Sequence, residues 1–176
     1  CASSFVRLPS ACRRCGLPLP VAQCPRRTAE WHVDAMIAAF EYAEPLDHYI
    51  HSFKYRKERA LGRALALLIA PMLSAATVLP DALVAVPLHR SRLIERGYNQ
   101  AQELARYLGR ELGLPVLSRG FGRRSADRSQ TRQSARARRS GVAGAFVVQG
   151  RLACRQVAIV DDVITTGATV NAFAAA

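Results

Sequence analysis

The chain has 176 residues, half of them hydrophobic, which is enough to bury one main core with a small additional module. This composition excludes an intrinsically disordered chain. The longest uncharged run, residues 64–80, contains Pro71, Ser74 and Thr77 and is shorter than the roughly 20 apolar residues of a membrane-spanning helix.

The chain carries 25 basic and 13 acidic residues, a net charge of +12, and all basic residues except Lys54 and Lys57 are arginines. Because guanidinium groups match phosphate oxygens, this favours an anionic partner, either a phosphorylated metabolite or a nucleic acid; the alternative is a solubilising surface. Five cysteines without a secretory signal favour a reducing, cytoplasmic environment and metal binding over disulfides. Since the chain begins at Cys1 and stops at Ala176 inside a predicted helix, we expect a fragment.

The first elements in chain order divide the sequence into two expected units. Residues 1–33 hold four of the five cysteines and predict a small module, and residues 34–176 predict the main domain. The main domain opens with an apolar stretch at 34–42 that predicts a strand, followed by a predicted helix over 45–58. A core helix limited by Pro71 and Pro80 is then predicted from apolar residues at helical spacing, namely Leu61, Leu65, Leu68, Ile69 and Met72.

Strands and helices alternate in the rest of the chain. Residues 82–88 predict a buried strand, and an apolar stripe over 101–112 predicts a helix that ends at Gly113. This alternation predicts an α/β fold with a mostly parallel sheet covered by helices on both faces. Ligands bind beyond the carboxyl ends of such strands, so the loops after Val86 and Val160 are the expected sites. The further predicted strands are 115–118, 145–148 and 157–160.

The sequence VAIVDDVITTGATV, residues 157–170, is the central motif. Asp161 and Asp162 follow the predicted strand, and Gly167 precedes a predicted helix whose free amides suit an anion. Threonine hydroxyls add donors to such an anion site, and the carboxylates accept hydrogen bonds from sugar hydroxyls. The pattern favours a phosphorylated ribose; the alternative is a strand, a turn and a capped helix.

This segment resembles the phosphoribosyl-pyrophosphate signature of type I phosphoribosyltransferases. The resemblance implies that Asp161 and Asp162 are the catalytic, ribose-binding pair. It also implies a 5′-phosphate site formed by Thr165, Thr166, Gly167, Ala168 and Thr169.

The stretch VPLHRSRLIERGYNQ, from Val86, is similar to the ComF family, a bacterial branch of this fold linked to competence and DNA uptake. CRRCGLPL and SFKYRKERALGRALA extend the likeness over nearly the whole chain. It implies a type I phosphoribosyltransferase-like sheet with an N-terminal zinc-ribbon-like module. For individual residues the alternatives are that His89 caps a loop, Asn99 caps a helix and Gln100 lies at the surface. The implied pyrophosphate-binding residues are His89, Arg90, Arg92 and Arg96, and Asn99, Gln100 and Gln130 are further candidates.

Residues 119–139 contain eight arginines and one acid, and they predict a mobile basic loop. Gln130 matches the family pattern, whereas Asp127, Gln133 and Gly141 depart from it, which puts catalytic closure of this loop in doubt. The run is either a solvated face or a contact for phosphate or nucleic acid.

Cys12, Cys15 and Cys24 resemble part of a zinc knuckle, which needs four ligands. The family has a second Cys-x-x-Cys pair, but Arg27 occupies the position of its last cysteine. Cys1 or His32 are candidates for the fourth ligand, and the alternative is that the metal has been lost.

Two functions follow as hypotheses. The first is a ComF-like protein that binds phosphoribosyl pyrophosphate with Mg²⁺, and no residue stands out as a base for activating an acceptor. The second is a DNA-uptake accessory protein that binds single-stranded DNA or a helicase through its arginines.

Overall fold

The computed structural model describes residues 4–8, 11–17, 24, 30–75, 79–124 and 144–176. Its centre is a parallel sheet of three strands in the order β2-β1-β5. Leu83 of β1 lies opposite Val116 of β2 and Ala158 of β5. The strands are β1 (Ala82–Ala85), β2 (Val116–Leu117) and β5 (Val157–Val160).

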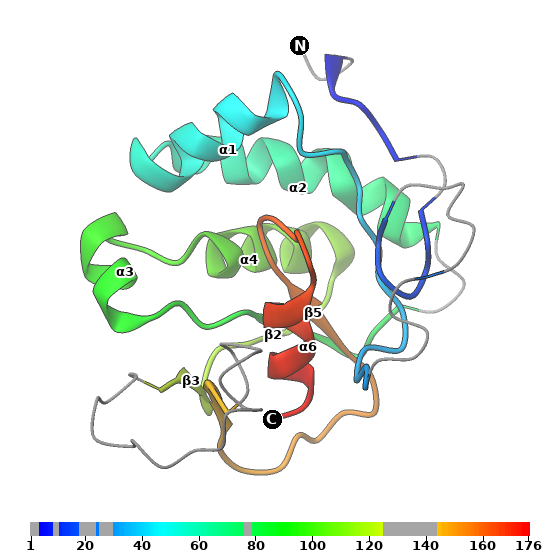
Figure 1. Ribbon diagram of the computed structural model, residues 1–176, viewed down its shortest axis with the longest axis vertical. Helices are drawn as coiled ribbons and strands as arrows, with labels where there is room; N and C mark the ends of the chain where they lie inside the picture. Colours follow the sequence, from blue (N-terminus) through cyan, green and yellow to red (C-terminus); the bar gives the residue numbers. More distant parts are fainter. Residues whose placement is uncertain (1–3, 9–10, 18–23, 25–29, 76–78, 125–143) are drawn as a thin grey trace.

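Helices cover both faces of this sheet, as the sequence predicts (Figure 1). Three helices pack on one face, and a short C-terminal helix packs on the other. The first three are α1 (Leu46–Tyr55), α2 (Arg59–Ser74) and α4 (Gln100–Leu112), the last is α6 (Ala168–Ala174), and α3 (Arg90–Arg96) lies beyond the end of β1. The α/β prediction is therefore confirmed.

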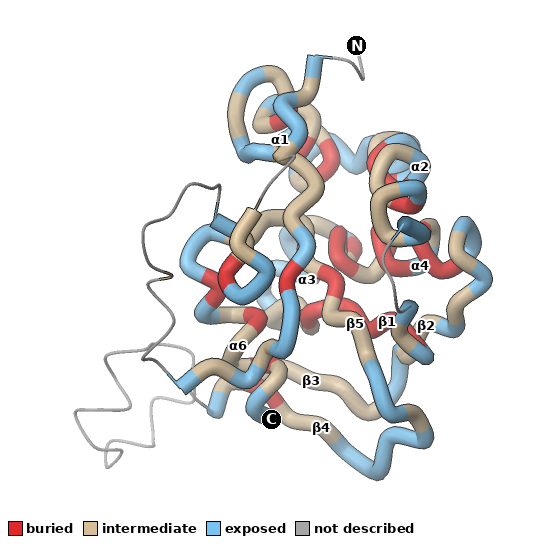
Figure 2. The backbone as a smooth tube through the Cα atoms, turned by 90° about the vertical axis from the view of Figure 1, so that its right-hand side faces the viewer, coloured by how far each residue is buried: buried red, intermediate tan, exposed pale blue. Residues whose placement is uncertain are grey.

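The pleat of β1 divides the core into two layers. All four residues of β1 are buried (Figure 2), as expected for a central parallel strand. Leu83 and Ala85 pack with the α1, α2 and α4 side chains, whereas Val84 and Val86 pack with Phe146 and α6. Because successive side chains of a strand point to opposite faces, one short strand anchors both layers.

A second, antiparallel sheet lies on the α6 side (Figure 2). It pairs β3 (Phe121–Arg123) with β4 (Phe146–Val148). Phe121 and Phe146 both contact the ring of Phe173 of α6, with ring centroids 5.9 and 5.0 Å from it. The sequence predicts β4 but not β3, which falls within the predicted basic loop at 119–139. Phe121 is the one aromatic residue among the arginines of that loop, so no strand pattern is visible there.

The predicted strand at 34–42 is wrong. Within this stretch the structure has one isolated bridge, between Phe40 and Arg7. The apolar side chains pack locally: Phe40 lies edge-on to Phe5, and Met36 is buried beside Gly16. These contacts with the N-terminal segment take the place of a sheet ladder.

Pro71 does not limit its helix, because α2 continues to Ser74. A proline near the C-terminal end removes a single hydrogen bond, and the chain closes the turn with the Ala75 amide donating to the Pro71 carbonyl at 3.2 Å. Among the described residues no helix is long and apolar enough to cross a membrane.

The order of the strands places a topological switch point, where a ligand-binding crevice is expected, between β1 and β5. The chain leaves β1 through α3 and α4 to reach β2 on one side, and it later places β5 on the other side. The connections after β1 and β5 therefore diverge at their carboxyl ends, which is where open α/β sheets bind ligands. The two loops predicted from the sequence, after Val86 and Val160, flank this point.

Candidate functional site

The acid pair lies at the carboxyl end of β5, next to β1. The Val86 amide donates to the Val160 carbonyl at 3.0 Å, which extends the β1–β5 pairing to the start of the crevice. Asp161 and Asp162 follow directly and are both half-buried. The Asp162 amide donates to Asp161 Oδ1 at 2.9 Å, so the backbone fixes the orientation of the first carboxylate.

Burial raises the pKa of Asp161 to about 7, and repulsion from Asp162 adds to this effect. Three effects act against this rise and lower the pKa of Asp161: the hydrogen bond from the Asp162 amide, the charge of Lys54 and the charge of Arg123. Asp161 therefore changes its charge near neutral pH.

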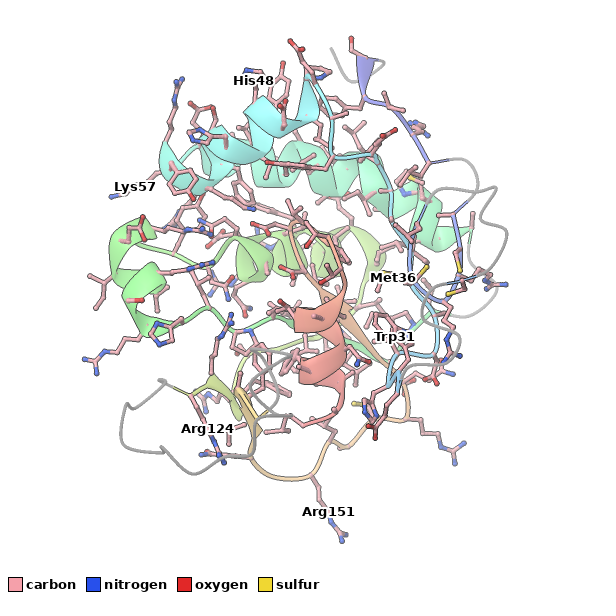
Figure 3. All side chains as sticks on the ribbon, in the orientation of Figure 1. Trp31, Met36, His48, Lys57, Arg124 and Arg151 are labelled. Atoms are coloured by element: carbon pink, nitrogen blue, oxygen red, sulfur yellow. The ribbon has the colours of Figure 1, made fainter. Side chains whose placement is uncertain are left out.

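The loop after the acid pair exposes Thr165 and Thr166 and buries Gly167. Gly167 has φ +72°, and a Cβ there would lie 2.6 Å from Trp31 Cη2, so the position requires glycine. The hydroxyl of Thr166 accepts from the Ala168 amide at 3.3 Å. The ring of Trp31, labelled in Figure 3, packs against Gly167, whereas Thr165 and Thr166 are exposed.

The segment that carries Trp31 is fastened to α6. The His32 amide donates to Asn171 Oδ1 at 2.7 Å, and Asn171 Nδ2 donates to the Glu30 carbonyl at 3.2 Å. Residues from the N-terminal part of the chain thus hold the start of α6 in place.

The second predicted loop is largely a short helix, α3, which the sequence analysis did not predict. His89 is its N-cap, since its Nδ1 accepts from the Ser91 amide at 3.3 Å. Arg90 and Arg92 are exposed. Arg96 is half-buried and donates to Gln100 Oε1 at 3.1 Å and to the Tyr55 hydroxyl at 3.4 Å.

Asn99 and Gln100 have clear structural roles. Asn99 caps α4 by accepting from the Ala101 and Gln102 amides, and its Nδ2 donates to the Val86 carbonyl at 2.9 Å. Gln100 is 1% exposed, so its alternative interpretation as a surface residue is wrong. A pocket of about 140 Å³ lies beside this junction, and its lining includes Pro87, Leu93, Asn99, Ser118 and Phe121.

Two basic residues near the acid pair were missed by the sequence analysis. Lys54 Nζ of α1 lies 3.2 Å from Asp162 Oδ2. Arg123 of β3 interacts electrostatically with both Asp161 and Arg92, and burial followed by the Arg92 charge lowers its pKa. Lys54 was detectable in principle, because lysine is so rare in this chain. Arg123 was hidden in the arginine-rich run, of which residues 125–143, including Gln130, lie outside the described residues.

The three cysteines are brought together, with their Sγ atoms all within 4.8 Å of one another. Gly16, at φ +72°, allows the tight turn after Cys15. Hydrogen bonds from the Cys15 and Arg14 amides lower the Cys12 pKa to about 7, whereas burial raises that of Cys15. Such a cluster can hold a metal ion such as zinc, for which tetrahedral thiolates lie about 3.8 Å apart.

The fourth ligand is not identified among the described residues. His32 does not join the cluster; its ring lies 3.7 Å from Glu30 Oε1. Cys1 and Arg27 lie outside the described residues.

These features define a class: an α/β protein whose topological switch point carries two adjacent carboxylates and a threonine-glycine loop, with a cysteine cluster from its N-terminal part. DNA utilization protein YhgH of Escherichia coli O157:H7 is 35% identical over an alignment of 173 positions, which covers 93% of this chain and 75% of that protein. Competence protein F of Haemophilus influenzae is also 35% identical over 173 aligned positions, which cover 91% of this chain and 75% of that protein. YhgH of Salmonella typhi is 33% identical over 184 aligned positions, which cover 99% of this chain and 80% of that protein.

The chain therefore belongs to the family of Competence protein F and DNA utilization protein YhgH, as the resemblance to ComF implied. No protein-family model and no solved structure matches it.

The raised pKa of Asp161 predicts that Asp161→Asn stabilises the fold in a pH-dependent way. A carboxyl with a raised folded-state pKa contributes stability that is full below its ordinary value of 3.8 and is lost as the pH rises through about 7. Asparagine does not ionise, so the variant avoids this loss. Its free energy of unfolding relative to that of the unaltered chain should therefore increase from pH 4 to pH 7. It should reach on the order of 4 kcal/mol at pH 8, at about 1.4 kcal/mol for each pKa unit. Urea unfolding at pH 4, 6 and 8 measures it.

Asp81→Asn is the matched control with the opposite sign. Amides of Gln156 and Arg155 donate to Asp81 and lower its pKa, so this carboxylate stabilises the fold at neutral pH and loses that effect on acidification. A pH-independent effect of Asp161→Asn, or a loss of stability at pH 8, would contradict the assignment.

Proposed function

We propose that the crevice between β1 and β5 binds phosphoribosyl pyrophosphate together with Mg²⁺. The observation that carries this proposal is the placement of Asp161 and Asp162 at the switch point, followed directly by two exposed threonines and a glycine of positive φ. The resemblance of the segment at 157–170 to the phosphoribosyl-pyrophosphate signature of type I phosphoribosyltransferases supports it.

Each part of the ligand has a complementary group. The ribose 2′ and 3′ hydroxyls would donate to the carboxylates of Asp161 and Asp162. The 5′-phosphate would accept from amides and hydroxyls of the loop at 165–169. The pyrophosphate, bound together with Mg²⁺, would face the side of α3, where Arg90 and Arg92 are exposed. His89 and Arg96 belong to the same proposed subsite.

The reaction that this arrangement would serve is transfer of the phosphoribosyl group. A nucleophile would attack the anomeric carbon, the bond from that carbon to the pyrophosphate oxygen would break, and the electron pair would leave with pyrophosphate. Arginines placed at the departing oxygens would stabilise the charge that develops there.

Isothermal titration calorimetry tests the binding. Phosphoribosyl pyrophosphate with Mg²⁺ should give a saturable heat with the whole chain. Asp161→Asn/Asp162→Asn should weaken it at least about tenfold, because each lost charged acceptor costs about 1.5 to 3 kcal/mol. Asp34→Asn/Glu41→Gln removes the same charge from exposed positions and should bind as the unaltered chain does. No heat, or equal heat for the two double variants, would refute the proposal.

We also propose that the cysteine cluster binds one zinc ion. The four described cysteines are free thiols, which fits a reducing, cytoplasmic environment, and zinc requires thiolates. Elemental analysis of purified protein should find about one zinc per chain, and Cys12→Ser should lose it, whereas Cys154→Ser, outside the cluster, should keep it. Zinc retained in Cys12→Ser would exclude this site.

A second candidate function is binding of single-stranded DNA, directly or with a DNA-uptake helicase. The names of the relatives, which refer to DNA utilization and competence, and the charge of +12 favour it. Exposed arginines are available: Arg124 and Arg151 extend away from the ribbon in Figure 3.

Salt dependence tests DNA binding. Fluorescence anisotropy with a labelled oligonucleotide should show an affinity that falls about tenfold or more between 50 and 200 mM salt, because arginines displace counterions. Arg90→Ala/Arg92→Ala should reduce both the affinity and the salt slope relative to Arg63→Ala/Arg110→Ala, which changes exposed arginines of α2 and α4. Binding that ignores salt would count against this function.

A further inference from the structure

We propose that Lys54 is a positioning residue of the acid pair: its ammonium group holds Asp162 in the crevice and allows the two adjacent carboxylates to be ionised together. This inference rests on the proposed function, because it assigns the acid pair to ligand binding. The motif at 157–170 contains no basic residue, so the compensating charge must come from another part of the chain.

The ion pair is well shielded from water. Lys54 Nζ and Asp162 Oδ2 are 3.2 Å apart, and the two side chains are 18% and 13% exposed. Exposed ion pairs contribute little because water screens them, whereas a shielded charge that loses its partner is costly. Loss of Lys54 would therefore leave the shielded Asp162 carboxylate without its ion-pair partner.

The groups that surround Asp161 account for its charge state. Asp162 repels it from the next position, the amide of Asp162 donates to it, Lys54 approaches from α1, and Arg123 approaches from β3. Among these groups, Lys54 also forms an ion pair with Asp162. Removing it takes away a positive charge that favours the ionised form of Asp161.

The position of Lys54 is itself fixed by the residues of the second loop. Gln100 Nε2 donates to the Lys54 carbonyl at 3.4 Å, and Gln100 Oε1 accepts from Arg96. Next to Lys54, the Phe53 carbonyl accepts from the Tyr98 hydroxyl. The C-terminal turn of α1 is thus fastened to the start of α4, and the side chain of Lys54 reaches across to the end of β5.

A ribose diol binds to carboxylates that accept hydrogen bonds, and a protonated carboxyl loses part of this capacity. The proposal therefore predicts weaker binding of phosphoribosyl pyrophosphate when the lysine charge is removed. It also predicts that the pH at which Asp161 ionises moves upward in the ligand-free protein.

The first experiment is calorimetry with phosphoribosyl pyrophosphate and Mg²⁺ from pH 6 to 9. At pH 7, Lys54→Met should bind about tenfold more weakly than the unaltered chain, and Lys54→Arg should recover most of the affinity. Lys57→Met is the matched control: it changes the one other lysine, which is exposed and points away from the crevice (Figure 3), and it should bind normally.

The second experiment needs no ligand. NMR of protein labelled with ¹³C at aspartate carboxyls, with Asp161 assigned by comparison with Asp161→Asn, follows its titration. The midpoint should rise by about one pH unit in Lys54→Met and stay in place in Lys57→Met and Lys54→Arg. If Lys54→Met does not fold by circular dichroism, Lys54→Gln replaces it with the same expectations.

The outcomes separate the two proposals. If the unaltered chain binds no phosphoribosyl pyrophosphate but the titration moves as expected, the proposed ligand is wrong and the role of Lys54 on the acid pair stands. If the ligand binds but Lys54→Met neither weakens binding nor moves the titration, the role of Lys54 is overturned. Equal effects of Lys54→Met and Lys57→Met would also overturn it, because the cause would then be net charge.

Discussion

The structure depends on the parallel pairing of β1 with β5. This ladder, continued by the Val86 amide and the Val160 carbonyl, brings two segments more than 70 residues apart to one edge. Because β1 also pairs with β2, the chain leaves the two strands in different directions. The topological switch point at the carboxyl ends of β1 and β5 is a consequence of this strand order.

Two half-buried carboxylates lie together at the switch point, and positive charges from distant parts of the chain offset their negative charge. Asp161 and Asp162 are neighbours in sequence and repel each other. The charges that offset them come from Lys54 of α1 and Arg123 of β3, one from each side of the sheet. Leu46 and Ile50 anchor α1 in the core beside α2, and the same packing brings Lys54 to the acid pair.

The N-terminal part of the chain contributes to the same site by a different route. The segment at 30–32 is hydrogen-bonded to Asn171 of α6, and Trp31 fills the space behind Gly167. A larger residue at 167 would collide with this ring. The shape of the threonine-glycine loop is thus set by a tryptophan more than 130 positions earlier.

From the sequence alone, local periodicity and short motifs were enough to predict the α/β class, the central strands and the place of the acid pair after β5, and they offered the N-cap as one interpretation of Asn99. The prediction of a strand at 34–42 was wrong, because its apolar side chains pack against Gly16 and Phe5 instead of joining a sheet. The elements α3 and β3 were not predicted, because arginines interrupt their apolar pattern. Only the tertiary structure decided the burial of Gln100 and the partners of Asp161 and Asp162. Those depend on which distant side chains the packed helices bring within a few ångströms, and no local pattern encodes that distance.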